Sequence, residues 1–90
     1  MTEKDLIPGT VVQHFKRKML TETERADSTQ YLYEILGVAH HTETGEKLVV
    51  YRALYGEGKI CARPFDMFLS ETDHEKYPQA EQKFRFEPLK

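Results

Sequence analysis

A cluster of imidazole and carboxylate groups lies in the middle of the chain, where residues 40–46 read HHTETGE. Such groups bind divalent metals or transfer protons, so His41, Glu43 and Glu46 are the candidates for metal-assisted hydrolysis. Neighbouring strand residues point to opposite faces, which keeps His40 and His41 from reaching one ion, and the segment lacks a zinc spacing such as His-x-x-x-His. We therefore expect a polar cluster that fixes a turn, and we predict no metal and no cofactor.

A second group of side chains combines tyrosine with arginine. Guanidinium planes and tyrosine rings stack on bases, and a guanidinium binds a carboxylate or phosphate through two parallel hydrogen bonds. Alternatively, the tyrosines cover the outside of the fold and the arginines pair with nearby carboxylates. Exposed, convergent arginines would favour recognition, whereas buried and paired ones would favour an architectural role. The candidate ligand-binding residues are Tyr51, Arg52, Tyr55, Arg63 and Arg85.

Motifs of known enzyme classes are missing from the sequence. It contains no glycine-rich phosphate loop and no nucleophile elbow, and neither Ser28 nor Ser70 lies beside a convincing catalytic base. The one cysteine, Cys61, excludes an internal disulfide, and its apolar strand context favours inert packing. The sequence therefore favours binding over catalysis.

The elements that would position these residues are predicted to be short strands. Turn residues and apolar alternation predict strands over 10–17, 30–41, 47–54, 60–63 and 84–86. A hairpin turn at 42–46 uses Gly45, and its expected register places Tyr51 opposite Gly37. After Pro64, the spacing of Phe65, Phe68 and Leu69 predicts a helical turn that plugs the core.

Two polar segments, 18–29 and 70–83, are predicted to be long loops. Thr21 and Glu24 have the spacing of a capping box, but no apolar run follows them, so we do not expect a helix there. These elements predict a mainly β fold: a small SH3-like β-barrel or roll of about five strands with one short helical turn. Residues 1–90 would form one domain, with a β-barrel core over 10–88.

Composition limits the partners. The chain of 90 residues carries 13 Lys and Arg against 15 Asp and Glu, so its net charge of −2 disfavours indiscriminate binding to nucleic acid. Its apolar runs are much shorter than the roughly 20 residues that span a bilayer, and its N-terminus lacks the apolar region of a signal peptide. We expect a cytoplasmic protein with no membrane partner.

Several motifs resemble those of one family. The segment 33–39, YEILGVA, is followed by HTET at 41–44, VVYRALY at 49–55, Arg63-Pro64, Met67-Phe68 and Arg85-Phe86. Together they resemble the short bacterial family known as domain of unknown function 1653, over residues 8–88. In that family residues 18–29 would be an insertion, an arginine often replaces His40, and an aromatic residue lies near the position of Cys61. The resemblance implies a compact β-rich domain with no established activity, cofactor or catalytic residue.

Three functions follow from these observations. The first is a binding or adaptor module that recognises an acidic peptide, a nucleotide or nucleic acid through the tyrosine and arginine group. The second is a metal-assisted hydrolase that uses His41, Glu43 and Glu46. The third is a structural domain whose exposed edge strand pairs two copies into a homodimer.

Overall fold

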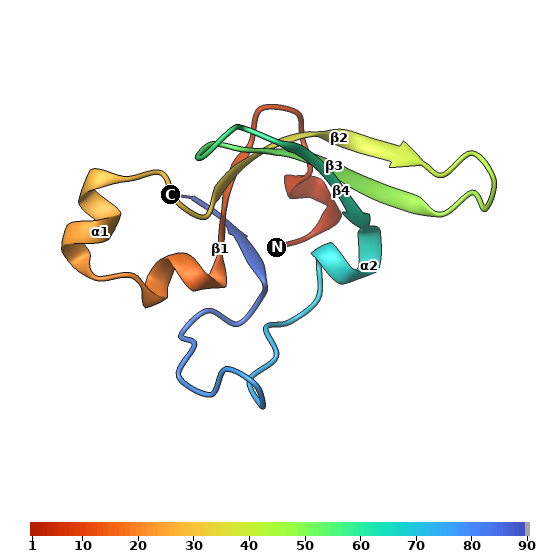
Figure 1. Cartoon of the computed structure of the whole chain (residues 1–90). Coiled ribbons are helices and arrows are strands. Elements are labelled where there is room, and N and C mark those ends of the chain that lie inside the picture. Colours follow the sequence, from red (N-terminus) through yellow and green to blue (C-terminus); the bar gives the residue numbers. More distant parts are fainter. Residues whose placement is uncertain (90) are drawn as a thin grey trace.

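The structure is a computed structural model that describes residues 1–89. Four short helical elements and five strands follow one another along this part of the chain, with the second, third and fourth strands in direct succession (Figure 1). The helical elements are η1 (Glu3–Asp5), η2 (Phe15–Met19), α1 (Glu22–Asp27) and α2 (Phe65–Phe68). The strands are β1 (Val11–His14), β2 (Leu32–His40), β3 (Lys47–Ala53), β4 (Ile60–Pro64) and β5 (Phe86–Pro88).

The strands form one antiparallel sheet of five strands in the order β4-β3-β2-β1-β5. The prediction of a mainly β fold is therefore confirmed. Within residues 1–89, β4 and β5 do not pair with each other, so the sheet is open and the predicted SH3-like barrel is not confirmed. The sheet nevertheless curls, since Figure 1 shows β5 lying beneath the β2-β3-β4 layer.

Side chains connect the two edge strands across the hollow of the curled sheet. The guanidinium carbon of Arg63 on β4 lies 5.5 Å from the ring centre of Phe86 on β5. The ring of Phe86 stacks on that of Phe68 in α2, with centroids 4.1 Å apart. The predicted aromatic plug is thus present, and it completes a core made of Leu6, Val12, Ile35, Val49, Tyr51, Phe68 and Phe86.

The hairpin of β2 and β3 forms as expected, but its predicted register is wrong. The turn closes between His41 and Glu46, whose backbone groups are hydrogen bonded at 2.8 Å, and Gly45 supplies a φ of +75°. This turn pairs His40 with Lys47, and a β-bulge then shifts the register between Ile35 and Gly37. As a result, Tyr51 pairs with Ile35 and Gly37 pairs with Val50.

We expected an irregular loop over 18–29, but this segment contains α1. Its capping box is formed: Thr21 Oγ1 accepts from the Glu24 N–H at 3.1 Å, and Glu24 Oε1 accepts from the Thr21 N–H at 2.8 Å. The helix has no buried residue. The Arg17 guanidinium holds it instead, by donating to the carbonyls of Arg25, Ser28 and Gln30.

The C-terminal strand lies two residues later than predicted. The Phe15 N–H donates to the Arg85 carbonyl, and the Leu89 N–H donates to the Val11 carbonyl. Residues of an antiparallel pair alternate between hydrogen-bonded and non-hydrogen-bonded positions, so the backbone nitrogen of Pro88 points away from β1, towards the outer edge of the sheet. The N–H that proline lacks is not needed for pairing there. The segment 70–83 contains turns and an isolated bridge from Glu71 to Phe84. No helix within residues 1–89 is long and apolar enough to cross a membrane.

Candidate functional site

The strand register brings side chains from all five strands to one face of the sheet. Residues that pair directly across antiparallel strands project from the same face. This rule groups Val12 with Tyr33, Tyr51 with Cys61, and His14 with Phe86. Phe68 of α2 packs against part of this inner face, and the rest forms two adjoining pockets. The inner face carries His14 of β1, Tyr33 of β2, Tyr51 of β3, Arg63 of β4 and Phe86 of β5.

The first pocket, which we call the tyrosine pocket, has a volume of about 540 Å³. Tyr33 and Tyr51 meet edge to face with ring centres 5.4 Å apart, and the hydroxyls of Tyr33 and Tyr55 share a hydrogen bond of 2.6 Å. Cys61 is exposed here, contrary to the inert packing that its strand context predicts. The size and mixed lining suit a small planar molecule. The lining residues are Tyr33, Tyr51, Ala53, Tyr55, Gly56, Glu57, Lys59, Cys61 and Arg63.

The hydroxyl of Tyr33 is a neutral hydrogen-bonding group in this pocket. Burial raises the pKa of Tyr33, and its hydrogen bond to Tyr55 raises the pKa further. The phenol of Tyr33 therefore keeps its proton at neutral pH and does not act there as a base. This pocket is suited to binding a ligand rather than to removing a proton from one.

Two cations line the tyrosine pocket, Lys59, which pairs with Glu57 at 3.9 Å, and Arg63. Arg63 is the one without an ionic partner among residues 1–89. Its side chain is half-buried, and its guanidinium lies over the Phe86 ring. No carboxylate among residues 1–89 lies within 4.0 Å of it. A half-buried guanidinium without an ionic partner retains its capacity to bind an anion.

Arg63 also lines a second, more polar pocket of about 220 Å³, which we call the cationic pocket. Burial lowers the pKa of His14 to about 4, and the charges of Arg63, Lys16 and Arg85 lower it in the same direction. The imidazole is therefore neutral at pH 7, and its Nδ1 accepts the Lys16 N–H at 3.2 Å. The lining residues are His14, Phe15, Lys16, Arg63, Asp73, Lys76, Tyr77 and Arg85.

The structure brings together four of the five residues of the predicted tyrosine and arginine group, and it leaves out Arg52. Tyr51, Tyr55, Arg63 and Arg85 line one or the other pocket. Arg52 follows Tyr51 directly, so it projects from the opposite face, where it forms a salt bridge with Glu34. Arg52 is paired, as the architectural alternative predicts, but it is exposed rather than buried.

Sequence reasoning missed other residues of these pockets. His14, Lys16, Tyr33, Lys76 and Tyr77 reach them from segments far apart in the chain. No local spacing signals this, because the grouping depends on the strand order. The alternation of side chains along a strand does carry one usable signal, because it predicts that Arg52 and Tyr51 project from opposite faces of the sheet.

The cluster of His41, Glu43 and Glu46 lies at the tip of the β2–β3 hairpin, far from α1 at the opposite end of the molecule (Figure 1). Nδ1 of His41 accepts the backbone N–H groups of Glu43 at 3.2 Å and Thr44 at 3.4 Å. With Nδ1 occupied, a neutral ring carries its proton on Nε2, so neither nitrogen offers a free lone pair to a metal. Within residues 1–89, no group of three or more potential metal-binding side chains exists. Of these three side chains, His41 is the one that is hydrogen bonded to the turn among residues 1–89.

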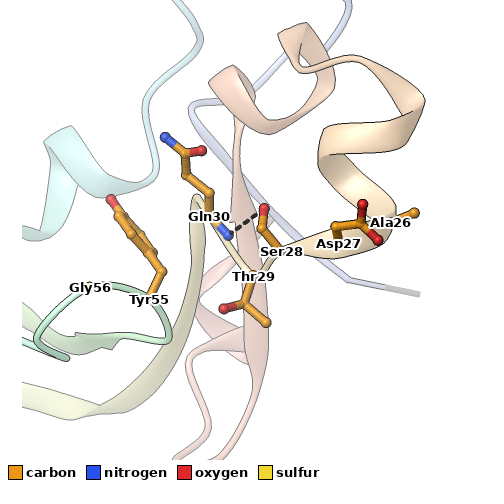
Figure 2. Close-up of a pocket in the computed structure, with 7 residues that line it drawn as sticks. All are labelled: Ala26, Asp27, Ser28, Thr29, Gln30, Tyr55 and Gly56. Carbon is orange, nitrogen blue, oxygen red and sulfur yellow. Dashed lines mark hydrogen bonds between the residues drawn. The ribbon is translucent and has the colours of Figure 1, made fainter.

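A further pocket of about 620 Å³ lies between α1 and the turn after β3. Figure 2 shows Tyr55 and Gln30 on its walls, with the Gln30 N–H bonded to Ser28 Oγ at 3.4 Å. The two hydroxyl groups of this pocket form hydrogen bonds within the fold. Ser28 Oγ donates to the Glu24 carbonyl, and Thr29 Oγ1 donates to the Leu54 carbonyl. It shares Tyr55 and Gly56 with the tyrosine pocket, and we regard it as a shallow extension of that pocket.

Comparison with known proteins gives one finding about the family. Residues 10–88 match the model of the family described as "Protein of unknown function (DUF1653)". The resemblance predicted from the motifs is therefore confirmed over nearly the same range. Neither a curated protein nor a solved structure matches the chain.

Proposed function

Because the chain belongs to the DUF1653 family, whose description assigns no activity, we propose a function from the geometry of the inner face. The protein is a non-catalytic binding module that holds a nucleoside phosphate, either as a free nucleotide or as part of a single strand of nucleic acid. The tyrosine pocket receives the base, and Arg63 binds the phosphate.

The observation that carries this proposal is the position of Arg63. Its guanidinium has no carboxylate partner among the described residues, yet it lies at the border of a pocket lined by three tyrosine rings. A planar base stacks on aromatic rings, and a guanidinium binds phosphate oxygens through two parallel hydrogen bonds. A nucleoside phosphate carries both groups in one small molecule.

Two further observations favour this ligand class over the alternatives. A carboxylate side chain of an acidic peptide would engage the cation and leave the aromatic walls uncovered, whereas a base would fill them. The net charge of −2 favours a single nucleotide or a short single strand, because a long duplex needs an extended basic surface. A cytoplasmic location, which stays a prediction, would expose the module to both ligands.

The open edge of β4 favours a second candidate, the self-associating structural domain. Among residues 1–89, β4 pairs only with β3, and its Ile60 is 66% exposed. An unpaired edge with exposed apolar residues is a template for a second copy. Sedimentation of the full chain at low and high concentration tests this: a concentration-dependent dimer would support it, and a monomer throughout would remove it.

The nucleotide proposal is tested by titrating the full chain, labelled with ¹⁵N, at low salt. The probes are AMP, an eight-nucleotide single-stranded RNA and a hexaglutamate peptide. We expect AMP and the RNA to shift the amide signals of Tyr51, Tyr55 and Arg63, and hexaglutamate to leave them unchanged. Tighter binding of the RNA would identify the source as nucleic acid, and equal affinities would identify it as free nucleotide.

Matched variants locate the site. Arg63→Gln should weaken AMP binding at least tenfold, whereas Arg52→Gln, a change on the opposite face, should alter it less than twofold. Arg63→Lys keeps the charge without the planar fork and should fall between them. The proposal is wrong if neither AMP nor the RNA binds at millimolar concentration, if hexaglutamate causes the same shifts, or if both glutamine variants weaken binding equally.

A further inference from the structure

We propose that the cationic pocket is a phosphate-binding site in its own right, in which His14, Lys16, Arg63 and Arg85 surround one phosphate group. The inference rests on the proposed function only for the identity of the nucleoside attached to that phosphate. The pocket adjoins the tyrosine pocket at Arg63, so one ligand can occupy both.

The first support is an excess of positive charge on a small polar pocket. Four cations line about 220 Å³, namely Lys16, Arg63, Lys76 and Arg85, together with the single carboxylate of Asp73. That carboxylate is engaged in its own turn, because Asp73 Oδ1 accepts the N–H groups of Glu75 at 3.1 Å and Lys76 at 3.2 Å. None of the four cations lies within 4.0 Å of a carboxylate of residues 1–89.

The second support is the way in which the fold holds these cations close together. Lys16 and Lys76 each lie over the ring of Tyr77, with their ammonium nitrogens 5.6 Å and 5.5 Å from its centre. Arg63 lies over Phe86. Aromatic faces attract cations and orient them without neutralising them. The positive charge of the pocket therefore remains available to an anion.

The third support is a set of hydrogen-bond donors without acceptors. The Nε–H of Arg85 is buried, and it has no hydrogen-bond partner in the described chain. Leaving a buried charged donor unsatisfied is costly, and an anion in the pocket would offset that cost. The neutral His14 ring offers a second donor, its Nε2–H, because its Nδ1 accepts the Lys16 N–H.

An anion would also relieve the repulsion among these groups. The fold gathers like charges from η2, β4, the loop 70–83 and the residue before β5. Burial is the main cause of the low pKa of His14, and the charges of Arg63, Lys16 and Arg85 lower that pKa further. Phosphate carries up to two negative charges on a compact tetrahedron whose oxygens accept hydrogen bonds in several directions. Its chemistry fits the donors and the charge of this pocket.

The probe for the test is inorganic phosphate, added to the ¹⁵N-labelled full chain at pH 7 and low salt. We expect saturable shifts at His14, Lys16, Arg63 and Arg85, without shifts at Tyr55. Arg85→Gln should weaken phosphate binding at least fivefold. Lys83→Gln is the matched control, because Lys83 lies two residues earlier and does not line the pocket, so its effect should stay below twofold.

Lys16→Gln provides a second variant, should Arg85→Gln fail to fold, and it should also weaken binding severalfold. Equal weakening by Lys83→Gln, or shifts spread over lysines outside the pocket, would overturn the inference by showing general attraction of anions. If adenosine binds as tightly as AMP, the phosphate group adds nothing to binding, and the inference of a phosphate site is also overturned. The tyrosine pocket would remain a site for the base. Phosphate binding without AMP binding would support the phosphate site and remove the proposed nucleotide function.

Discussion

The hairpin tip and the inner face of the sheet both gather imidazole and charged side chains, but they differ in what those side chains bind. At the tip, His41 accepts the N–H groups of Glu43 and Thr44, so its imidazole is hydrogen bonded within its own turn. On the inner face, Arg63 and Arg85 come from distant segments and have no carboxylate partner among residues 1–89. Polar groups brought together only by tertiary structure are therefore the better candidates for a ligand site.

The largest expected effect tests whether the inner face depends on the core beneath it. Phe68 is fully buried and stacks on Phe86, so Phe68→Ala should lower the free energy of unfolding by about 3–5 kcal/mol, measured by urea denaturation. Glu43→Ala at the exposed tip is the control, with an expected change below about 0.5 kcal/mol. Similar losses in the free energy of unfolding of Phe68→Ala and Glu43→Ala would contradict the distinction between the exposed hairpin tip and the packed inner face.

An intermediate effect concerns the buried histidine of the inner face. Folding lowers the pKa of His14 from 6.5 to about 4, so the unfolded state binds more protons between these values. The stability linked to His14 is fully present above about pH 6.5 and is lost as the pH falls towards 4. His14→Gln lacks this titration, so the difference in Tm between the wild-type protein and the variant should shrink as the pH falls from 7 to 4.5.

The outcome that would contradict this prediction is a difference in Tm that stays constant over the same pH range. A constant difference would mean that His14 has the same pKa in the folded and unfolded states. The His14 ring would then be less buried, and the cations of the inner face farther from it, than the structure has them.

The smallest effect belongs to the tip. His41→Ala removes the acceptor of two backbone N–H groups in an exposed turn, so it should lower the free energy of unfolding by about 1 kcal/mol. Zinc or manganese should leave the Tm of the wild-type protein unchanged. A rise in Tm with either metal that disappears in His41→Ala would instead favour the metal-assisted hydrolase, and would reverse the roles assigned to the two regions.

Local signals were enough to predict much of the fold. Alternating apolar residues around Gly45 predict the β2–β3 hairpin, and Phe65, Phe68 and Leu69 predict the helical turn at α2. The helix α1 could not be predicted in this way, because it has no apolar face and Arg17, outside the helix, secures its C-terminal end. The strand register also differs from the prediction, because the turn pairs His40 with Lys47, one residue away from the expected register, and the β-bulge between Ile35 and Gly37 shifts it by one residue more.

The candidate site was predictable in its chemistry but not in its full membership. Tyr51, Tyr55 and Arg63 were identified by residue type, and they line one pocket. His14 and Lys16 lie about fifty residues from Arg63 in the sequence, and only the order β4-β3-β2-β1-β5 and the curl of the sheet bring them near it. Residue types therefore indicate the kind of ligand that we propose, and the strand order determines which residues line the two pockets.

The contact between Arg63 and Phe86 has a mechanical consequence. It joins the two edge strands of the sheet, β4 and β5, through one cation and one ring, an attraction of about 0.5–2 kcal/mol. In a closed barrel, several backbone hydrogen bonds would join these two strands instead. We therefore expect β4 and β5 to separate more readily than any two hydrogen-bonded neighbours in the sheet. Among the strands, amide hydrogen exchange should be fastest where β4 and β5 meet. An anion that draws the Arg63 guanidinium away from the Phe86 ring would weaken this contact. Binding of the anion and separation of β4 from β5 would then be coupled through a single side chain.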